Sequence, residues 1–380
     1  MIVIGAGLSG LVIARCLADS GFSVDVFEKR SHIGGAVYDF VNEHGVVVHK
    51  YGPHIFHTNS EKVSEFIHRF SEWNIFKHKV LGRIDDVLCP IPFNLRSIEQ
   101  CFEEERAEVF KRKLIDLVGL ENTITIGELR GMDDEDMRVL ADFIYENIFY
   151  QYTLKQWGRT PEELGGNVMS RVPVRVSYRD EYFEDSYQLM PRNGYTAFLE
   201  NIADHGNIRV HLNCDADSRL RIKEGRVFFD GVEVEEPVVY TGCVDRLLEY
   251  KYGELPYRTL AFVFEEVKWP FQPTAVVNYP NVPEFTRISE FGHFYPDLIY
   301  EKSTIMREYP MAYRKDDEAH DPFYPISSEE SSRIYTSYVQ ELEKSGKFFL
   351  AGRLGSYKYM NMDVAILEGL TLAERIAERG

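Results

Sequence analysis

Three glycines near the start of the chain have the spacing of a dinucleotide-binding turn. Gly5, Gly7 and Gly10 form G-x-G-x-x-G directly after the apolar run that opens the sequence. The first glycine permits a tight turn, the second lets a pyrophosphate approach the backbone, and the third lets the next helix pack on the strand. That helix would offer free N–H groups and a positive dipole end to the phosphates. Residues 24–27 predict a second strand, and Glu28 follows where an acid accepts hydrogen bonds from a ribose.

Two further glycine turns favour FAD over NAD as the dinucleotide. The motif "HIGG" at 32–35 follows the acid closely, where an extended cofactor would run on past the ribose. Near the end of the chain, "KFFLAGRLG" at 347–355 predicts another strand and glycine turn before a final helix over 364–379. A chain that returns to its nucleotide domain in this way can close over a flavin, so we expect FAD.

Composition limits the class of protein and its partners. The chain has 380 residues, of which 44% are apolar, enough for two or three domains with a large core. It contains no apolar run of the ~18 residues that a membrane helix needs, and a net charge of −18 makes nucleic acid or an anionic membrane an unfavourable partner. The five cysteines include no C-x-x-C pair, so we expect no disulfide framework, no metal site and a cytoplasmic location.

The order of the patterns predicts an α/β protein in which a Rossmann-type FAD-binding domain is assembled from discontinuous segments. Helical periodicity dominates the first insertion, whereas short β-branched and aromatic runs with turns predict an antiparallel sheet in the second. The expected ranges are 1–80 with 201–250 and 335–380 for the FAD-binding domain, 95–165 for a helical domain with a mobile substrate loop near 157–171, and 166–200 with 251–334 for an antiparallel-sheet substrate domain.

A series of motifs in one order makes a more specific signal than the glycine fingerprint. They include "GAGLSG", "HIGG", "YGPHIFHT", "PFNL", "YTLKQWG", "RVPVR", "YGELPYR", "TRISEF", "PFYPI" and "GRLGSYKYMNMD". In these motifs the chain resembles the UDP-galactopyranose mutase family, flavin-dependent sugar-nucleotide ring-contracting mutases. The resemblance spans nearly the whole sequence.

The resemblance implies an isomerase, an intramolecular transferase that interconverts UDP-galactopyranose and UDP-galactofuranose. In that mechanism N5 of the reduced flavin attacks the anomeric carbon, and UDP leaves and later returns. There is no net redox change, but FAD must be kept reduced by an external reductant such as NAD(P)H. Bacterial relatives are generally dimers that serve polysaccharide assembly. We therefore expect a homodimer with a UDP-sugar substrate, acting in cell-surface polysaccharide biosynthesis.

Two arginines are implied to clamp the diphosphate of the substrate, Arg171 and Arg287. Negative charge grows on the leaving group as the anomeric bond breaks, so cations there stabilise the transition state more than the ground state. The planar guanidinium also binds phosphate oxygens bidentately. Without the resemblance, each would be interpreted as a surface ion pair in a chain with 61 acidic residues. Arg175 stays open between a substrate contact and a structural ion pair.

Aromatic residues are implied to form the remainder of the substrate site. Tyr152 would stack on uracil, and Trp157 would be carried to the sugar when its loop closes. Tyr182, Tyr324 and Tyr359 would donate hydrogen bonds to the diphosphate. For each of these residues the alternative is an aromatic side chain that packs in the core or anchors a loop.

The resemblance also places residues around the flavin. His57 would lie beside the isoalloxazine ring and Arg353 near the flavin and the sugar, while the helix opened by Met362 and Asp363 would point its N-terminus at the flavin carbonyls. The implied catalytic residues are Arg171, Arg287, Arg353 and His57. The implied cofactor-binding residues are Gly5, Gly7, Leu8, Ser9, Gly10, Glu28, Lys29, Gly34, Gly35, His57, Thr241, Gly352, Arg353, Tyr359, Met362 and Asp363.

Three departures from the family pattern leave the identity of the sugar open: Ala36, Leu189 and Gly292 stand where relatives usually carry Asn, Gly and Lys. The same chemistry on another nucleotide sugar is one alternative, with UDP-N-acetylgalactosamine, UDP-arabinopyranose or dTDP-fucopyranose as substrate. A flavin amine-oxidase-like oxidoreductase is a second, but it would have an apolar cage in place of a phosphate clamp. A non-catalytic nucleotide-binding relative is a third.

Overall fold

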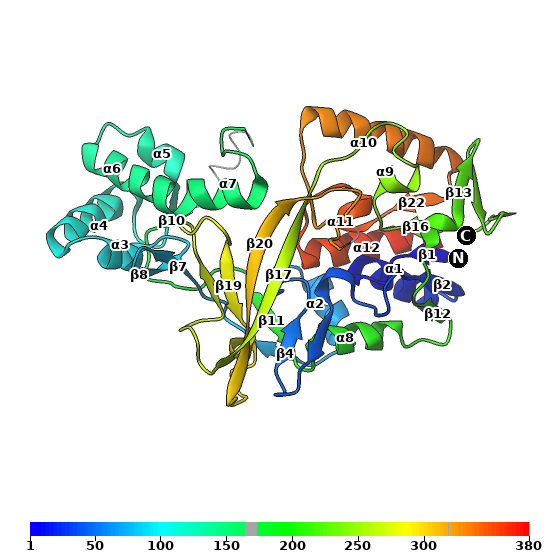
Figure 1. Cartoon of the computed structure of the whole chain (residues 1–380), viewed down its shortest axis with the longest axis horizontal. Helices are drawn as coiled ribbons and strands as arrows, with labels where there is room; N and C mark the ends of the chain where they lie inside the picture. Colours follow the sequence, from blue (N-terminus) through cyan, green and yellow to red (C-terminus); the bar gives the residue numbers. More distant parts are fainter. Residues whose placement is uncertain (164–172, 318, 380) are drawn as a thin grey trace.

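A five-stranded parallel sheet forms the centre of the first domain, with strand order β12-β2-β1-β16-β22 (Figure 1). The computed structural model describes residues 1–163, 173–317 and 319–379. The strands are β1 (Ile2–Ile4), β2 (Val24–Phe27), β12 (Ile208–His211), β16 (Val238–Tyr240) and β22 (Phe348–Leu350), and every pairing between them is parallel. Most of their residues are apolar because both faces of such a sheet are covered.

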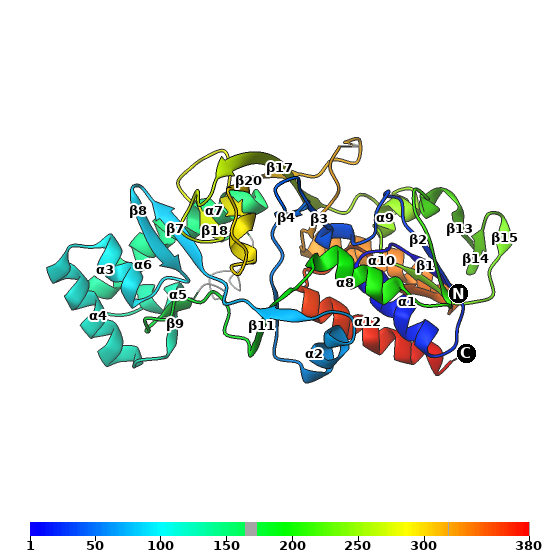
Figure 2. The same cartoon turned by 90° about the horizontal axis from the view of Figure 1, so that it is seen from below.

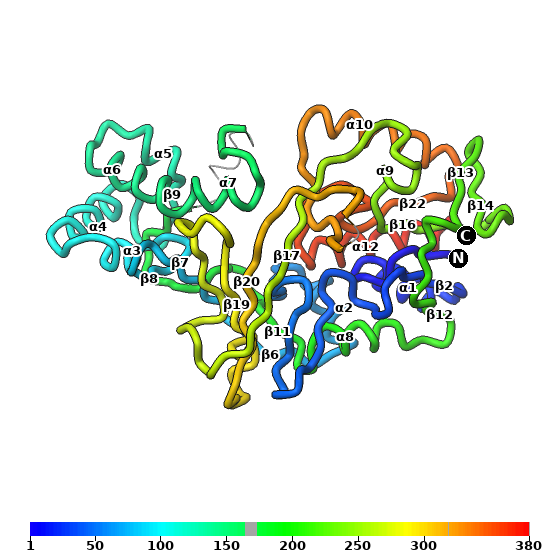
Figure 3. Tube along the Cα trace, viewed as in Figure 1, coloured from blue at the N-terminus to red at the C-terminus, as the bar shows by residue number. Residues whose placement is uncertain are grey.

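Helices on this sheet come from distant parts of the sequence. Helix α1 (Leu8–Asp19) connects β1 to β2 and packs on α12 (Met362–Ala377) and on α8 (Gly194–Ala203). Helices α9 (Val244–Leu247), α10 (Glu329–Leu342) and α11 (Gly352–Gly355) complete this part of the domain. The blue start, green middle and red end of the chain lie together, as the trace in Figure 3 shows. The prediction of a Rossmann-type domain built from discontinuous segments is confirmed.

Two smaller antiparallel sheets belong to the same end of the molecule. Strands β13 (Leu220–Lys223), β14 (Arg226–Phe229) and β15 (Val232–Glu233) form a meander. Its two turns contain Glu224–Gly225 and Asp230–Gly231, whose φ angles are all positive, as the E-G and D-G pairs predict. The second sheet is the hairpin of β3 (Asp39–Val41) and β4 (Val47–His49), which reaches toward the next domain.

The second domain is a seven-stranded sheet with the order β21-β17-β20-β19-β18-β7-β8. Its central pair consists of the long strands β17 (Tyr257–Lys268) and β20 (Lys302–Ala312). The others are β7 (Val80–Ile84), β8 (Val87–Ile91), β18 (Val276–Asn278), β19 (Arg287–Glu290) and β21 (Tyr324–Pro325), and the turn η5 (Phe291–Phe294) follows β19. All pairings are antiparallel except that of β18 with β7.

The range expected for this sheet differs from the observed one. In the described part of 166–200, β10 (Pro173–Arg175) pairs with β9 (Thr123–Thr125), and β11 (Tyr187–Pro191) pairs with β5 (Phe56–Thr58) and β6 (Trp73–Ile75). These strands are therefore outside the seven-stranded sheet, which instead recruits β7 and β8. The pattern of a short strand sets which face is buried but does not specify its pairing partner.

The third domain is helical and lies beyond the far edge of the seven-stranded sheet (Figures 1 and 2). It contains α3 (Leu95–Cys101), α4 (Glu104–Val118), α5 (Ile126–Arg130) and α6 (Glu135–Ile144), whereas α2 (Glu61–His68) packs on α12. Helix α6 continues through a π-helical segment, Tyr145–Tyr150, into α7 (Gln151–Trp157). Helix α7 ends at Gly158, which has a left-handed φ of 65°, and α7 contacts β20.

Among the described residues, no helix is both long and apolar enough to cross a membrane. The expected substrate loop runs out of the described residues at position 164, and Arg171 also lies outside them.

Candidate functional site

A cavity of about 710 Å³ runs along the carboxyl end of the parallel sheet, where ligands bind in folds of this type. Gly5, Gly7 and Gly10 line one end of it. Gly5 has a φ of +102°, and a Cβ on Gly10 would lie 1.9 Å from the carbonyl oxygen of Gly5. Helix α1 begins at Leu8, and its N-cap residue Gly7 makes no side-chain capping hydrogen bond. No side chain of the N-cap residue therefore stands between the N-terminus of α1 and the cavity. This arrangement suits a pyrophosphate, which binds to free backbone N–H groups.

Glu28 directly follows β2, at the position where a carboxylate would accept hydrogen bonds from the ribose of a dinucleotide. Only 3% of the residue is exposed, and its carboxylate accepts hydrogen bonds from the N–H groups of Ala6 (3.0 Å) and Arg30 (2.9 Å). Lys29 and Arg30 both pair with Asp321, at 2.6 Å and 2.5 Å. These ion pairs attach the segment before β21 to the nucleotide end of the cavity.

The other end of the cavity lies between His54, Arg353 and the start of α12 at Met362. The Nδ1 of His54 lies 2.8 Å from the carbonyl oxygen of Gly52. A carbonyl only accepts, so this nitrogen carries the proton and Nε2 is left as an acceptor. Burial lowers the pKa of His54 to about 3, with smaller contributions from His49 and Arg353, so the imidazole is neutral.

Most residues expected to bind the cofactor line this cavity. They are Gly5, Gly7, Leu8, Ser9, Gly10, Glu28, Lys29, Gly34, Gly35, Thr241, Gly352, Arg353 and Met362. His57, Tyr359 and Asp363 are not lining residues. The glycine floor, the helix terminus and the acid at the ribose position fit an extended dinucleotide, and the histidines that line the cavity are His54 and His320 rather than His57.

His57 instead stands on β5 in a side-chain network. Its Nδ1 lies 2.9 Å from a carboxylate oxygen of Asp185, and its ring stacks on Phe183 with centroids 3.8 Å apart. Asp363 accepts a hydrogen bond from Thr58, next to His57 on the same strand (3.2 Å). These contacts tie β5 to the first turn of α12.

Half-buried Arg287 and fully buried Glu308 form an ion pair at the centre of the seven-stranded sheet. The Nη2 of Arg287 donates to Glu308 Oε1 at 3.0 Å, and only 1% of the Glu308 side chain is exposed. Burial alone would lower the pKa of Arg287, but Glu308 raises it well above the ordinary value. The guanidinium therefore stays charged.

Two polar atoms beside this pair are left without a partner. The Nε of Arg287 and the Oδ1 of Asn278 are both buried, and neither has a hydrogen-bond partner in the described part of the chain. The two residues face each other in the register of β18 and β19. An unpaired buried polar atom costs about 1–3 kcal/mol, so these atoms indicate where a ligand would bind.

Three aromatic side chains cluster beside a second cation, Arg353. The rings of Tyr324 and Tyr359 stack with centroids 5.8 Å apart, and Trp157 lies 6.1 Å and 6.2 Å from them. The Cζ atom of Arg353 lies 5.1 Å and 5.2 Å from the two tyrosine rings. Arg353 also donates to the carbonyl of Met360 at 2.8 Å, which fixes its direction. The cluster connects the cavity to the end of α7.

Tyr152, Tyr182 and Tyr324 surround Arg287. Burial raises the pKa of each phenol, to about 12 for Tyr324, and the charge of Arg287 opposes this shift at all three. The phenols therefore stay neutral and can donate hydrogen bonds to an anion. The structure thus brings together every described residue expected to bind substrate: Tyr152, Trp157, Tyr182, Arg287, Tyr324 and Tyr359.

Arg175 has a structural role in these contacts. Its side chain donates to the main-chain carbonyls of Glu181 and Tyr182, the latter at 3.0 Å, and it pairs with Glu184 at 3.2 Å. It thereby fixes the backbone that carries Tyr182. Of the two alternatives left open for Arg175, these contacts support the ion pair.

Two of the three departures from the family pattern are packing positions. A Cβ on Gly292 would lie 2.5 Å from the ring of Trp269, so the longer side chain of relatives has no room here. Leu189 is 6% exposed and lies in β11 within the main core. Ala36 does line the cavity.

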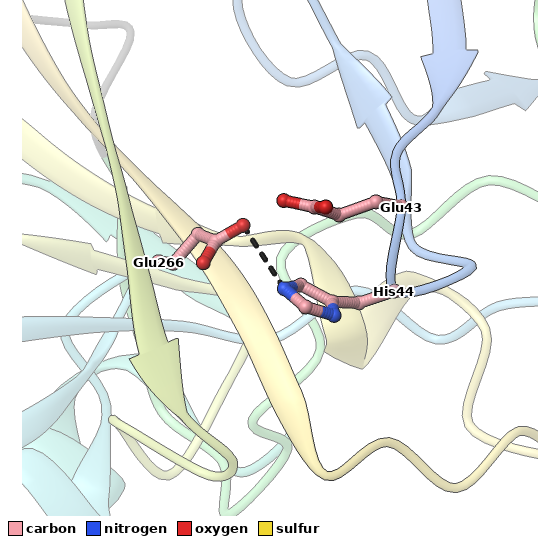
Figure 4. A group of neighbouring side chains, drawn as sticks. All are labelled: Glu43, His44 and Glu266. Carbon is pink, nitrogen blue, oxygen red and sulfur yellow. Dashed lines mark ion pairs between the residues drawn. The ribbon is translucent and has the colours of Figure 1, made fainter.

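Glu43, His44 and Glu266 have ligand atoms within 4.8 Å of one another, but none of these residues lines the cavity (Figure 4). His44 lies 3.0 Å from Glu266, and the ammonium of Lys302 approaches the same carboxylate at 3.5 Å. A neighbouring ammonium opposes a bound cation, so this group is better described as an ion-pair network that joins the β3–β4 hairpin to β17.

Sequence reasoning missed Glu308 and Asn278. Both lie on strands next to β19, and both are opposite Arg287 in register. The only available signal was a single charged or polar residue inside an apolar strand, and that signal has meaning only once the pairing is known.

The fold and the site define an α/β protein with a Rossmann-type nucleotide-binding domain, whose cavity lies beside a cluster of arginine and tyrosine side chains. A family model described as UDP-galactopyranose mutase matches residues 147–359, and a model of NAD(P)-binding Rossmann-like domains matches residues 3–70. The chain belongs to the UDP-galactopyranose mutase family, as its motifs predict. It is therefore an enzyme of the isomerase class, and the family implies a flavin cofactor.

Relatives cover almost the entire chain. It is 35% identical to a probable UDP-galactopyranose mutase from Klebsiella pneumoniae, over 98% of this chain and 94% of that protein. It is 32% identical to a dTDP-fucopyranose mutase from Escherichia coli, over 98% of this chain and 97% of that protein. The crystal structure of reduced UDP-galactopyranose mutase matches its fold with a TM-score of 0.73 at 17% identity, covering 100% and 95% of the two chains.

Proposed function

We propose that this protein interconverts UDP-galactopyranose and UDP-galactofuranose with FAD as its cofactor. The observation that carries the proposal is the anion site beside the cavity, where Arg287 and Asn278 have unpartnered buried atoms and three phenols converge. A nucleotide sugar would place its diphosphate there and its sugar toward Arg353 and the cavity.

The cavity residues would hold FAD along the sheet edge. The glycine turn and the N-terminus of α1 would take the pyrophosphate, Glu28 the ribose, and His54, Arg353 and the start of α12 the isoalloxazine end. When bound and reduced, FAD supplies a nucleophile for the anomeric carbon.

The other steps fall to the protein. Arg287 would stabilise the negative charge that grows on the diphosphate when it leaves, and its pair with Glu308 holds the guanidinium in place beforehand. Neutral tyrosines would hold the released UDP by hydrogen bonds without adding charge. Trp157 would cover the sugar and exclude water, which would otherwise hydrolyse the activated sugar.

A second candidate substrate is dTDP-fucopyranose. The relative that bears this name is nearly as similar to the chain as the one named for UDP-galactopyranose. The described site residues would contact a diphosphate, a base and a sugar in general, so the proposal extends to both candidates.

Incubation of the dithionite-reduced holoprotein with UDP-galactofuranose, followed by chromatography, tests the proposal. We expect UDP-galactopyranose to form, and the oxidised holoprotein to give no turnover. Conversion of dTDP-fucopyranose alone would transfer the proposal to the second substrate. Steady reduction of the flavin by a sugar or an amine would overturn both in favour of an oxidoreductase.

The clamp has its own test at Arg171. We expect Arg171→Ala to lower kcat at least roughly tenfold, about 1.4 kcal/mol. An unchanged kcat would remove Arg171 from the clamp. We also propose that NAD(P)H is the reductant, which bleaching of the flavin absorbance by NAD(P)H under anaerobic conditions would test. We propose a homodimer as the working form, which the molar mass from light scattering would test.

A further inference from the structure

Lys155 lies in the last turn of α7, and all the hydrogen bonds of its ammonium go to one loop. The Nζ atom donates to the main-chain carbonyls of Tyr279, Val282 and Phe285, the last at 3.0 Å. An ammonium has three N–H donors, so each has a carbonyl partner. All three carbonyls belong to the loop between β18 and β19.

This loop is bounded by the two residues with unpartnered atoms. Asn278 ends β18 on one side of the loop, and Arg287 begins β19 on the other. On the helix, Tyr152 precedes Lys155 by one turn and Trp157 follows it by two residues. Lys155 therefore links the element that carries the base- and sugar-facing aromatic residues to the loop that joins Asn278 and Arg287.

A second contact fixes α7 at its end but not against this loop. Arg258, on β17, donates to the carbonyls of Gln156 (2.9 Å) and Lys155 (2.8 Å). These bonds hold the last turn of α7 to the seven-stranded sheet. Among the described residues, the hydrogen bonds that join α7 to the 279–285 loop are those of the Lys155 ammonium.

The charge of Lys155 is held without a close carboxylate. Among the described residues Lys155 makes no ion pair, and Glu284 acts on it only from a distance. Burial lowers the pKa of Lys155 to about 8, and Glu284 opposes this shift. The ammonium is therefore stabilised by carbonyl dipoles and is charged at neutral pH.

We propose that Lys155 is a positioning residue that fixes the distance between the aromatic residues of α7 and Arg287, and so sets the affinity for the nucleotide diphosphate. The inference rests on the proposed function, because it requires the nucleotide to bind between these two elements. Lys155 does not reach the reacting atoms, so its effect should be on binding rather than on turnover.

The test compares Lys155→Met with Lys62→Met, a matched change at an exposed lysine that pairs with Glu374 away from the site. The probes are UDP and dTDP, titrated by calorimetry into the FAD-loaded protein. We expect Lys155→Met to raise the Kd for UDP and the KM at least about tenfold, with kcat within about threefold and an unchanged flavin spectrum. Lys62→Met should leave all these quantities unchanged. A Lys155→Met protein that binds UDP as tightly as the wild type overturns the inference.

The pH profile separates this role from general destabilisation. A neutral amine donates two hydrogen bonds rather than three, so the affinity of the wild type for UDP should fall as the pH rises through about 8. The other groups that face this region are Glu284, Arg258, Arg287 and Tyr152. The pKa values of Arg287 and of the Tyr152 phenol are raised, so both keep their protons in that range, and the Arg258 guanidinium stays protonated as well.

Lys155→Met should lack this transition. If Lys155→Met does not retain FAD, the wild-type profile decides: a Kd for UDP that is constant from pH 7 to 9.5 overturns the inference. Wild-type protein that binds neither UDP nor dTDP overturns the proposed function and this inference together.

Discussion

At the scale of single residues, the most informative feature is a carboxylate inside the proposed diphosphate site. Glu308 is nearly fully buried and lies against Arg287, which is expected to bind a diphosphate. A buried ion pair often contributes little net stability, because desolvation of both charges offsets their attraction. Its value here is geometric, since Glu308 holds the Nη2 end of the guanidinium and leaves Nε without a partner among the described residues.

Substitution of Arg287 should therefore destabilise the fold as well as the site. Arg287→Met leaves the Glu308 carboxylate buried and unpaired, which costs roughly 3–5 kcal/mol. We expect Arg287→Met combined with Glu308→Gln to recover most of that loss but to bind UDP no better than the single variant. Urea unfolding and calorimetry measure the two effects separately. Recovery of UDP binding in the double variant would contradict a direct role for Arg287.

At the scale of elements, the glycine turn separates the requirements of the fold from those of the ligand. The backbone at Gly7 (φ −80°, ψ −177°) suits any residue, and a Cβ there would meet nothing nearer than Gly35 Cα at 3.7 Å. A Cβ on Gly10 would instead lie 1.9 Å from the Gly5 carbonyl oxygen, which is backbone and cannot move cheaply. One glycine leaves space for the cofactor and the other lets α1 cross β1.

We therefore expect Gly7→Ala and Gly10→Ala to fail in different ways. Gly7→Ala should fold with the circular dichroism of the wild type but retain little FAD, because its methyl group would occupy the pyrophosphate position. Gly10→Ala should lower the free energy of unfolding of the apoprotein by several kcal/mol, as overpacking against backbone does. Flavin content and urea unfolding of both apoproteins measure this, and equal stability of the two would refute the distinction.

The sequence predicted elements well where a local pattern carried the signal. The strand at 24–27 and the final helix, expected over 364–379 and observed over Met362–Ala377, both follow from such local patterns. The pairing of β10 with β9 and of β11 with β5 and β6 could not be predicted, since register depends on residues far away in the sequence. The same limit hid Glu308, Asn278 and the carbonyl partners of Lys155.

At the scale of the whole molecule, the junction of the first two domains encloses a neutral histidine. His49 ends β4 and is fully buried; it stacks on Phe294 of η5 at 5.3 Å and meets Tyr195 of α8 edge-on at 5.6 Å. Its Nδ1 accepts a hydrogen bond from the N–H of His54 at 3.0 Å. One imidazole thus touches the parallel-sheet domain, the seven-stranded sheet and the loop that lines the cavity.

This junction should make the protein sensitive to acid. Burial lowers the pKa of His49, His54 and His78 to about 3 in each case. The unfolded chain binds these protons near pH 6.5, so the stability contributed by the neutral histidines is full above that pH and is lost as the pH falls toward 3. From pH 7 to pH 5 each histidine should lower the free energy of unfolding by about 2 kcal/mol.

The contribution of His49 can be isolated by His49→Asn, whose amide oxygen can still accept the hydrogen bond from His54. We expect this variant to be less stable than the wild type at pH 7, because a smaller side chain leaves a cavity. Its loss of stability between pH 7 and pH 5 should nevertheless be smaller by about 2 kcal/mol. Urea unfolding of the apoproteins at both values measures the difference. Carboxyl groups such as Asp39 and Asp217, whose pKa burial raises, titrate in both proteins, and their effects cancel in the comparison. Parallel pH profiles for the two proteins would show that His49 takes up a proton without cost, and that the junction opens to water before the domains unfold.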